Sequence, residues 1–580
     1  MEMAGPAAPK DPEKARPYFY ILKEKDIFGE RQKDGTGIQF IYESDGRLIN
    51  SAQITGNVTD KEELTLLETV EGFGRLVHSI GVSVETDRPE ETAEFVFQMY
   101  GKKDLYGGGT NLTTSLKCDG MEHRIYLSDY RWTEDDHVPG QIKILFAAPE
   151  RMGKVSVRLF LNDGYEAPPE EEDLVIDMHS EEYCGMISRS LLQLGNPYRI
   201  RKAIEKSKAG KEVTLAYIGG SITQGAGAIP IHTECYAYKS FQLFQNRFST
   251  QNNVRFIKAG VGGTPSELGM IRFDRDVLRE GERPDIVVIE FAVNDEGDET
   301  KGVCYESLVR KVLKLPWKPA VVLLFSVFAN DWNLQERLRP VGDLYDLPMV
   351  SIRDAVTPQF SLKCGEGRIL SKNQFFYDIF HPNNTGHTIM ADCLQYLFER
   401  CDAAEPARVG TFVEGMTEEQ ILSEKLSGPA VIGADFERIF LLDKKNRYVG
   451  AKIRAGSFTS TDIELQSVEM DRNLTQTPEF PYNWMYDGSR PQMPGFEMEI
   501  TCKSLFLIFK DSGETDVGKA NVFVNDVYCM TADPHKNNWL HCNAVLLFWE
   551  TESRSHKVRI AVTEEDWNKK FTILGFGYTI

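Results

Sequence analysis

The chain has 580 residues, of which 41% are hydrophobic and 26% charged, and its 87 acidic and 66 basic side chains leave a formal net charge of −21. This composition excludes a disordered chain, and the length allows about three to four domains of roughly 150 residues each. The acidic balance argues against a nucleic-acid binder, because phosphate neutralisation needs clustered lysine and arginine. The net negative charge is more compatible with neutral or cationic substrates.

Neither a membrane span nor a disulfide framework is expected. No stretch approaches about eighteen consecutive apolar residues. Residues 1–17 are expected to be flexible, and Met1–Arg16 lacks the apolar core of a secretory signal. The ten cysteines include no C-x-x-C pair, which disfavours disulfides and zinc sites. We therefore expect free thiols and a cytoplasmic location.

Short segments of alternating polarity, separated by turn residues, fill residues 18–173. Ala93–Tyr100 and Lys154–Leu161 are examples. Such segments at short spacing predict an antiparallel β-sandwich or jelly roll. Gly164–Asp173, with two prolines and a run of glutamates, is predicted to be a linker, and the polar segment 174–210 receives no predicted elements.

From Lys211 the pattern changes to continuous apolar strands that alternate with helical stretches. The predicted strands, the last of them a short apolar piece, are Val213–Ile218, Val254–Lys258, Asp285–Phe291, Ala320–Ser326 and Leu347–Ile352. The predicted helices are Tyr236–Phe248, Ser266–Arg279, Tyr305–Lys314 and Thr385–Arg400. Strands that are apolar on both faces indicate a parallel sheet covered on both sides. Residues 174–405 are thus predicted to hold a doubly wound, flavodoxin-like α/β domain.

Segments of alternating polarity return after the loop Asp402–Val409. The predicted strands are Ser504–Phe509, Ala520–Asp526, His556–Val562 and Phe571–Ile580. The same argument predicts a second β-sandwich over residues 406–580.

The turn after the first predicted strand of the α/β domain reads Gly-Gly-Ser-Ile-Thr-Gln-Gly over residues 219–225. Ligands of a doubly wound sheet lie beyond the carboxyl ends of its strands, so Ser221 is expected to face the crevice. The turn matches neither glycine-rich phosphate motif, which disfavours a phosphate loop. A plain structural turn is the other interpretation.

Two further turns are expected at the same edge of the sheet. Gly260–Thr264 follows the second strand, so its backbone N–H groups point into the crevice. Phe291–Asp295 ends the third strand and places the amide of Asn294 there. A helix N-cap role for Asn294 is equally compatible with the sequence.

Asp378 and His381 lie three residues apart in the segment before the closing helix. A histidine whose Nδ1–H is held by a carboxylate keeps Nε2 free as a base. The alternatives are a structural Asp–His pair or two metal ligands. A metal is disfavoured because no second histidine motif such as H-E-x-x-H accompanies the pair.

Together, these four blocks resemble the SGNH (GDSL-type) hydrolase superfamily over residues 211–400. Gly220 stands where the family name has Asp, and Ala292 stands where Gly is common. Neither departure removes a catalytic group. The variant Gly-Gly-Ser-Ile-Thr is similar to the carbohydrate esterase branch, which includes acetylxylan esterases.

The resemblance implies a role for each block. Ser221 would be the nucleophile and His381 its base, oriented by Asp378. The oxyanion hole would consist of the backbone N–H groups of Ser221 and Gly263 and the side-chain amide of Asn294. Such donors stabilise the tetrahedral oxyanion, and the base activates a hydroxyl that is otherwise a poor nucleophile.

Several other side chains are weaker candidates. Trp317, Trp332 and His232 are candidates for substrate binding, although packing or surface roles are more common for such residues. The aromatic cluster Pro481–Tyr486 is either a carbohydrate platform or a plug at a domain interface. His387 is expected to be structural.

The resemblance implies an esterase that acts through an acyl-enzyme and needs neither a cofactor nor a metal. The expected substrates are acetylated xylo-oligosaccharides, with manno-oligosaccharides or other sugar esters as alternatives. A lipid-directed acylhydrolase or thioesterase shares the blocks, but no amphipathic membrane-binding stretch supports it. A carbohydrate-binding protein without activity has no need of the complete set of Ser, Gly, Asn, Asp and His residues in the four blocks. Neither a nucleic acid nor a membrane is expected as a partner, and a homo-oligomer is left open.

Overall fold

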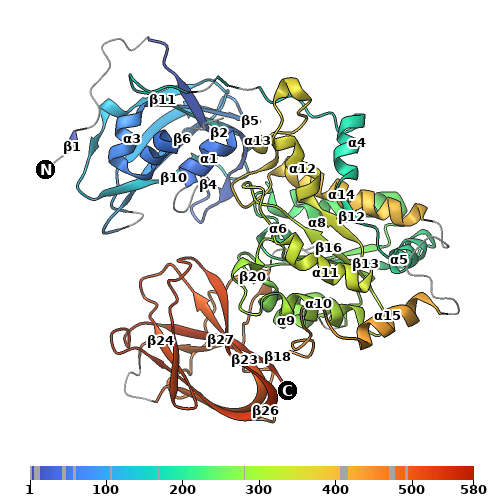
Figure 1. Cartoon of the computed structure of the whole chain (residues 1–580). Helices are drawn as coiled ribbons and strands as arrows, with labels where there is room; N and C mark the ends of the chain where they lie inside the picture. The colour runs from blue at the N-terminus through green and yellow to red at the C-terminus, as the bar shows by residue number, and fades with distance from the viewer. Residues whose placement is uncertain are drawn as a thin grey trace.

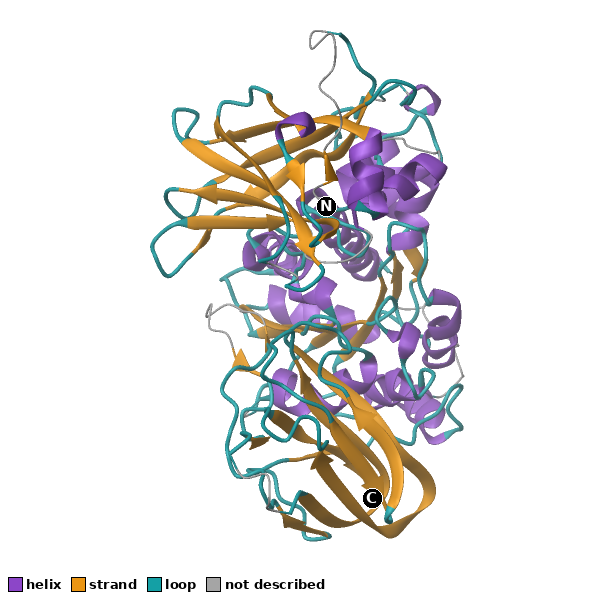
Figure 2. Cartoon of the chain, turned by 90° about the vertical axis from the view of Figure 1, so that its left-hand side faces the viewer, coloured by secondary structure: helices purple, strands orange, loops and turns teal. Residues whose placement is uncertain are grey.

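The computed structural model describes residues 3–4, 14–41, 47–55, 61–104, 107–167, 169–170, 172–279, 281–404, 416–468, 477–489 and 494–580. Figure 1 shows a strand-rich N-terminal part and a strand-rich C-terminal part on the same side of a central part that holds most of the helices. In Figure 2 the strands of the N- and C-terminal parts lie at the top and bottom of the molecule.

The N-terminal part contains two antiparallel sheets, with strand orders β3-β4-β10-β6-β7 and β2-β11-β5-β8. Its strands are β2 (Tyr18–Phe28), β3 (Glu30–Arg31), β4 (Gly37–Ile41), β5 (Val77–Thr86), β6 (Thr92–Gly101), β7 (Asn111–Lys117), β8 (His123–Tyr126), β10 (Asp136–Phe146) and β11 (Met152–Leu161). Its helices include α1 (Arg47–Thr55), α2 (Lys61–Thr65) and α3 (Val70–Leu76). Buried residues of both sheets share one apolar cluster, which is what alternating strands require.

The N-terminal segment that we expected to be flexible falls largely outside the described residues. Within it, β1 (Met3–Ala4) pairs in antiparallel fashion with β9 (Arg131–Trp132). The two predicted strands of this part are present as β6 and β11.

The central part is built on a six-stranded sheet of order β12-β17-β16-β15-β13-β14. Its strands are β12 (Leu191–Gln193), β13 (Val213–Gly219), β14 (Val254–Gly260), β15 (Ile286–Glu290), β16 (Ala320–Phe325) and β17 (Met349–Ser351). Five strands run parallel, and β12 joins the edge in antiparallel orientation. Every residue of β13, β15 and β16 is buried, as predicted from their unbroken apolar character.

Helices cover both faces of this sheet. The helices of the central part include α4 (Glu181–Ser188), α5 (Tyr198–Lys208), α8 (Tyr236–Phe248), α9 (Ser266–Phe273), α10 (Val303–Leu313), α11 (Gln335–Tyr345), α12 (Ile352–Phe360), α13 (Lys372–Phe375) and α14 (Asn384–Ala403). One apolar cluster joins α5, α8, α12 and α14 to the sheet, and a second joins α9, α10 and α11 to the other face.

Two sequence-based expectations for this part are corrected. The predicted helix Ser266–Arg279 is α-helical only as far as Phe273, where α9 ends. The next residues, Asp274–Leu278, form a π-helix. The segment 174–210, for which no element was predicted, contains α4, β12 and α5. Of the α5 side chains, Ile200, Ala203, Ile204 and Ser207 are buried, which is a helical spacing on a strongly charged segment.

The C-terminal part contains an eight-stranded antiparallel sheet. Its strands are β18 (Phe440–Leu442), β19 (Ala451–Arg454), β22 (Trp484–Tyr486), β23 (Phe496–Asp511), β24 (Ala520–Val524), β25 (Val527–Ala532), β26 (His541–Val562) and β27 (Phe571–Thr579). Phe506, Ile508 and Leu574 of this sheet share a buried cluster with α9 and α10. This shared core fixes the C-terminal part against the central part. The predicted boundary at residues 405–406 lies outside the described residues.

In the part of the chain that the structure describes, no helix is long and apolar enough to cross a membrane. All ten cysteines lie in described ranges, and none of them forms a disulfide.

Candidate active site

Three neighbouring parallel strands end at the same edge of the central sheet. The register pairs Gly219 of β13 with Gly260 of β14 and with Glu290 of β15. The turns after these strands carry Ser221, Gly263 and Asn294. Ser221 begins α6 (Ser221–Gln224), which lies on the side of the central part that faces the other two parts (Figure 1).

Ser221, His381 and Asp378 form a continuous hydrogen-bonded series. His381 Nε2 lies 2.9 Å from Ser221 Oγ, and His381 Nδ1 lies 2.9 Å from Asp378 Oδ2. Asp378 Oδ1 also accepts the backbone N–H groups of Phe380 at 2.8 Å and His381 at 2.9 Å. With Nδ1–H donated to the carboxylate, Nε2 is the acceptor for the serine hydroxyl. This is the geometry of an activated serine nucleophile.

The loop that carries Asp378 and His381 is closed at its base. Phe376 and Pro382 form an antiparallel bridge, and Tyr377 N–H donates to His381 O at 2.8 Å. Asn383, which follows the loop, accepts the N–H of Gly386 and so caps α14. These bonds hold the base of the loop while its tip faces Ser221.

Asn294 lies directly beside Gly220. A Cβ atom built on Gly220 would lie 2.6 Å from Asn294 Nδ2, so the asparagine amide fills the space that a side chain at residue 220 would need. Asn294 precedes the short helix η4 (Asp295–Gly297), but its side chain makes no capping hydrogen bond. Its Oδ1 is buried and has no hydrogen-bond partner among the described residues. The capping alternative for this side chain therefore has no support in the geometry.

Gly263 adopts the left-handed backbone conformation, with φ of 69°. A Cβ atom there would lie 2.9 Å from Trp539 Cζ2 and 3.1 Å from His541 Nε2. Glycine is required on both counts. His541 Nε2–H donates to Gly263 O at 3.1 Å, and Gln466 Nε2 donates to Gly262 O at 2.9 Å. The C-terminal part thus contacts the second turn of the site directly.

Trp539 and His541 were not found by sequence reasoning. Trp539 is 45% exposed and stands beside the ring of His541, with centroids 4.7 Å apart. The sequence offers one signal, a tryptophan in a polar turn, Lys-Asn-Asn-Trp, just before an apolar strand. Nothing in the sequence indicates that this turn meets Gly263.

The three weaker candidates are placed differently. Trp332 follows β16 and stacks on Phe328 at 5.8 Å; Phe328 contacts Phe380, which in turn contacts the ring of His381. Trp332 therefore lies on the same side as the triad. Trp317 does not: its indole N–H donates to Pro284 O, just before β15 begins, at the opposite edge of the sheet. The expectation that Trp317 binds substrate is corrected, because a parallel sheet separates its two edges by the length of a strand.

His232 lies in α7 (Ile231–Glu234) and is partly buried. His387 is fully buried on α14. Its Nδ1 accepts from Tyr236 N at 3.1 Å and its Nε2–H donates to Ala226 O at 3.1 Å. Burial lowers the pKa of His387 to about 3, so this ring is neutral and holds the turn after Ser221.

The aromatic cluster of the C-terminal part is mostly core. Trp484 and Tyr486 are 5% and 3% exposed and belong to the apolar cluster of the C-terminal sheet. Tyr482 is exposed, with Lys445 Nζ 5.1 Å from its ring centroid. Of the two alternatives, burial favours a packing role for Trp484 and Tyr486.

Two buried carboxyl groups lie beneath the turns. Thr223 Oγ1 donates to Glu290 Oε2 at 3.0 Å, and burial raises the pKa of Glu290 to about 7. Asp295 Oδ1 accepts Ser266 N–H at 2.7 Å, where α9 begins, and burial raises the pKa of Asp295 to about 8. Among the described residues, no three His, Cys, Asp or Glu side chains gather in a way that could hold a metal ion.

With this geometry in view, the comparisons with known proteins decide the family. Residues 217–389 match the model of the GDSL-like Lipase/Acylhydrolase family. This part of the chain is a GDSL-type hydrolase. The resemblance predicted from the four sequence blocks is confirmed over these residues, and with it the expectation of a carboxylic ester hydrolase. No curated protein sequence matches the chain.

Solved structures resemble a large share of this chain. A two-domain esterase (CEX) active on acetylated mannans, co-crystallized with mannopentaose, is 24% identical with a TM-score of 0.53, and covers 68% of this chain and 98% of its own. A second structure of a two-domain esterase of that description is 23% identical with a TM-score of 0.54, and covers 68% and 99%. At this identity the likeness shows a shared fold. The acetylxylan esterase Axe2 from Geobacillus stearothermophilus is 19% identical with a TM-score of 0.26, and covers 34% of this chain and 97% of its own.

Proposed function

We propose that this protein is a serine esterase that removes O-acetyl groups from oligosaccharides derived from plant polysaccharides. The observation that carries the proposal is the 2.9 Å contact between His381 Nε2 and Ser221 Oγ, with Asp378 on the other ring nitrogen. Ser221 Oγ attacks the acetyl carbonyl carbon while its proton passes to His381 Nε2. The sugar hydroxyl leaves with that proton. Water then hydrolyses the acetyl-enzyme by the same route.

The developing oxyanion would be bound by the backbone N–H groups of Ser221 and Gly263 and by the Asn294 amide. Support comes from the Asn294 side chain, which is free of a capping bond, and from the left-handed turn at Gly263. Donors held in place before the reaction are worth more than donors in water, because no solvent has to reorganise as charge forms.

A sugar substrate is supported by the aromatic side chains around the site. The exposed indole of Trp539 lies beside Gly263, and Trp332 connects through two phenylalanine rings to His381. Flat apolar faces next to polar groups suit the two faces of a pyranose ring. The shared fold with an esterase active on acetylated mannans adds manno-oligosaccharides to the expected xylo-oligosaccharides as substrates of equal standing.

The proposed architecture follows from the sheet orders. Numbered along the chain, the five parallel strands of the central sheet have the order 2-1-3-4-5, which is the flavodoxin-like arrangement. We assign it to residues 174–405, with one β-sandwich before it over residues 18–173 and another after it over 406–580. The protein is proposed to be cytoplasmic and to work without a metal or cofactor.

Mass spectrometry of acetylated xylo- and manno-oligosaccharides tests the proposal. The full chain should shift the products by loss of acetyl groups, and Ser221→Ala should lower kcat by at least about 10³-fold with the fold intact. A folded Ser221→Ala variant that kept a tenth of wild-type activity would exclude Ser221 as the nucleophile. Activity that rises with acyl chain length, with no deacetylation of either oligosaccharide, would instead favour the lipid-directed acylhydrolase.

A further inference from the structure

Lys25 is a buried ammonium group where the N-terminal part meets the central part. It lies on β2 and is 3% exposed. Its Nζ donates to the carbonyl oxygen of Phe376 and lies 3.5 Å from the carbonyl oxygen of Asn373. Lysine is almost never fully buried without a partner, because removing its charge from water is costly. In the described part of the chain, no carboxylate forms an ion pair with Lys25, so its contacts are backbone carbonyls.

These two carbonyls lie at the base of the loop that carries Asp378 and His381. Phe376 forms the bridge with Pro382 that closes the loop. Asn373 O also accepts Asn383 Nδ2 at 3.1 Å, on the far side of the loop. The ammonium group of Lys25 therefore contacts one end of the loop directly and reaches the other end through a shared acceptor.

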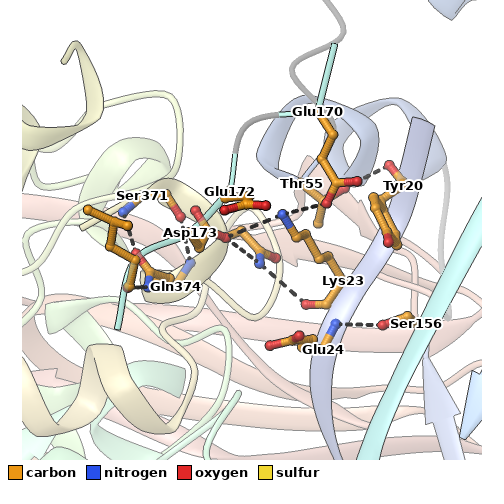
Figure 3. A network of polar contacts seen from close by, with 12 residues as sticks. Tyr20, Lys23, Glu24, Thr55, Ser156, Glu170, Glu172, Asp173, Ser371 and Gln374 are labelled. Carbon is orange, nitrogen blue, oxygen red and sulfur yellow. Dashed lines mark hydrogen bonds and ion pairs between the residues drawn. The ribbon is translucent and has the colours of Figure 1, made fainter. Parts of the chain in front are cut away.

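The rest of the boundary supports this placement. Asn373 Nδ2 donates to Lys23 O at 3.3 Å and to Asp173 Oδ2 at 3.2 Å. Lys23 Nζ pairs with Glu170 at 3.0 Å (Figure 3). Ile54 of α1 belongs to the apolar cluster of the central part. The N-terminal part is thus fixed against α13 by apolar contact and by this polar network. Lys25, on the same strand as Lys23, extends these contacts to Phe376 at the base of the loop.

Lys25 is close enough to the site to interact electrostatically with Asp378. Burial lowers the pKa of Lys25 to about 8, and the negative charges of Asp378, Asp26 and Asp173 act in the opposite direction. The charged groups that act on Asp26 are Lys154, Lys25, Glu234 and Lys239. Of the three carboxylates that favour the ammonium form, Asp378 acts most strongly, and it is the carboxylate that orients His381.

We propose that Lys25 is a positioning residue for the esterase site: its ammonium group, supplied by the N-terminal part, holds the base of the loop that presents Asp378 and His381 to Ser221. This inference rests on the proposed roles of those three residues. It gives the N-terminal part a function in the reaction, because an unheld loop would present the base to Ser221 in fewer molecules.

A fluorophosphonate, which phosphonylates activated serines, tests the inference independently of the natural substrate. Lys25→Met should be labelled about 10- to 100-fold more slowly than wild type, with kcat for p-nitrophenyl acetate lowered by a similar factor. KM for this small ester should change less than about twofold, and Lys25→Arg should restore most of the rate. Lys23→Met is the matched control, since Lys23 lies on the same strand in an ion pair with Glu170, and it should be labelled at the wild-type rate.

The outcomes separate this inference from the proposed function. If wild type is not labelled at Ser221, the proposed function fails, and the inference fails with it. If wild type is labelled and folded Lys25→Met, checked by circular dichroism, is labelled equally fast, the positioning role alone is overturned. Should Lys25→Met not fold, Lys25→Gln decides, because it removes the ammonium group but keeps a polar N–H donor. Folded Lys25→Gln should be labelled more slowly than wild type, and a rate equal to that of wild type overturns the inference.

Discussion

His541 Nε2 donates to the carbonyl oxygen of Gly263 at 3.1 Å, across 278 residues of chain. The ring is oriented by Asn537, whose Nδ2 donates to His541 Nδ1 at 3.0 Å and also to Asp511. Because Asn537 donates to Nδ1, Nε2 carries the hydrogen and acts as the donor. The C-terminal part thereby fixes the peptide group whose neighbouring N–H is proposed to bind the oxyanion.

Removing this bond should slow the reaction without preventing folding. We expect His541→Leu to lower kcat about 10-fold, because the glycine turn loses the donor that fixes it, while KM for p-nitrophenyl acetate changes little. The matched control is His535→Leu, since His535 Nε2 also donates to a carbonyl, Glu514 O at 3.1 Å, within the same part of the chain. Equal kcat values for the two variants would show that the contact with Gly263 is not needed for catalysis.

Trp539 should affect sugar binding rather than chemistry. Its exposed indole lies beside the site, so Trp539→Ala should raise KM for an acetylated oligosaccharide by about 10-fold, or about 1.4 kcal/mol. Kinetics with p-nitrophenyl acetate, which has no sugar ring, should stay close to wild type. Trp567→Ala is a suitable control because Trp567 is 53% exposed in the same part of the chain. An unchanged KM for the oligosaccharide would remove Trp539 from the proposed binding surface.

The central sheet and its edge were predictable because their signals are local. The helix Tyr236–Phe248 was predicted with the bounds that the structure has, since its buried side chains recur at helical spacing. Ser221 and the Asp378–His381 pair lie in short motifs whose chemistry depends on neighbours a few residues away. Parallel strands then bring such motifs to one edge wherever they lie along the chain.

The contacts supplied by the flanking parts were not predictable. Lys25 contacts Phe376 across 351 residues, and Trp539 reaches Gly263 only because the C-terminal sheet packs against α9 and α10. Periodicity predicts which face of a strand is buried but not which neighbouring part covers it. Trp317 was expected near the site, but it precedes β16 and therefore lies at the other edge of the sheet.

Asn294 permits a direct test of its two interpretations. As an oxyanion donor, its loss in Asn294→Ala should lower kcat by about 10²–10³, or about 2.7–4 kcal/mol, with KM for a small acetyl ester nearly unchanged. As a helix cap, its loss would cost about 1 kcal/mol of stability and leave the chemistry intact. Kinetics and thermal melting on the same preparation distinguish the two. Near-normal kcat with a lowered Tm would leave the oxyanion hole to backbone amides alone.

The buried carboxyl groups predict how stability depends on pH. Burial raises the pKa of Glu290 from 4.5 to about 7, so the folded state holds this proton more tightly than the unfolded chain does. The stabilisation is complete below pH 4.5 and is lost as pH rises to about 7. The loss for one such group is about 3 kcal/mol at 1.36 kcal/mol per pH unit. Asp295, whose pKa is raised to about 8, acts in the same direction.

Glu290→Gln removes one of these titrations and keeps an oxygen acceptor for Thr223. Its Tm should therefore fall less than that of wild type between pH 5 and pH 8, and the difference should be largest at the alkaline end. The control is Glu205→Gln, because the Glu205 side chain is 67% exposed and its neutralisation should leave the wild-type pH dependence in place. Thermal melting across this range measures all three proteins. If the melting temperatures of Glu290→Gln and wild type change in parallel with pH, Glu290 does not carry a tightly held proton in the folded state. The loss of stability at high pH must then come from Asp295 and the other buried acids.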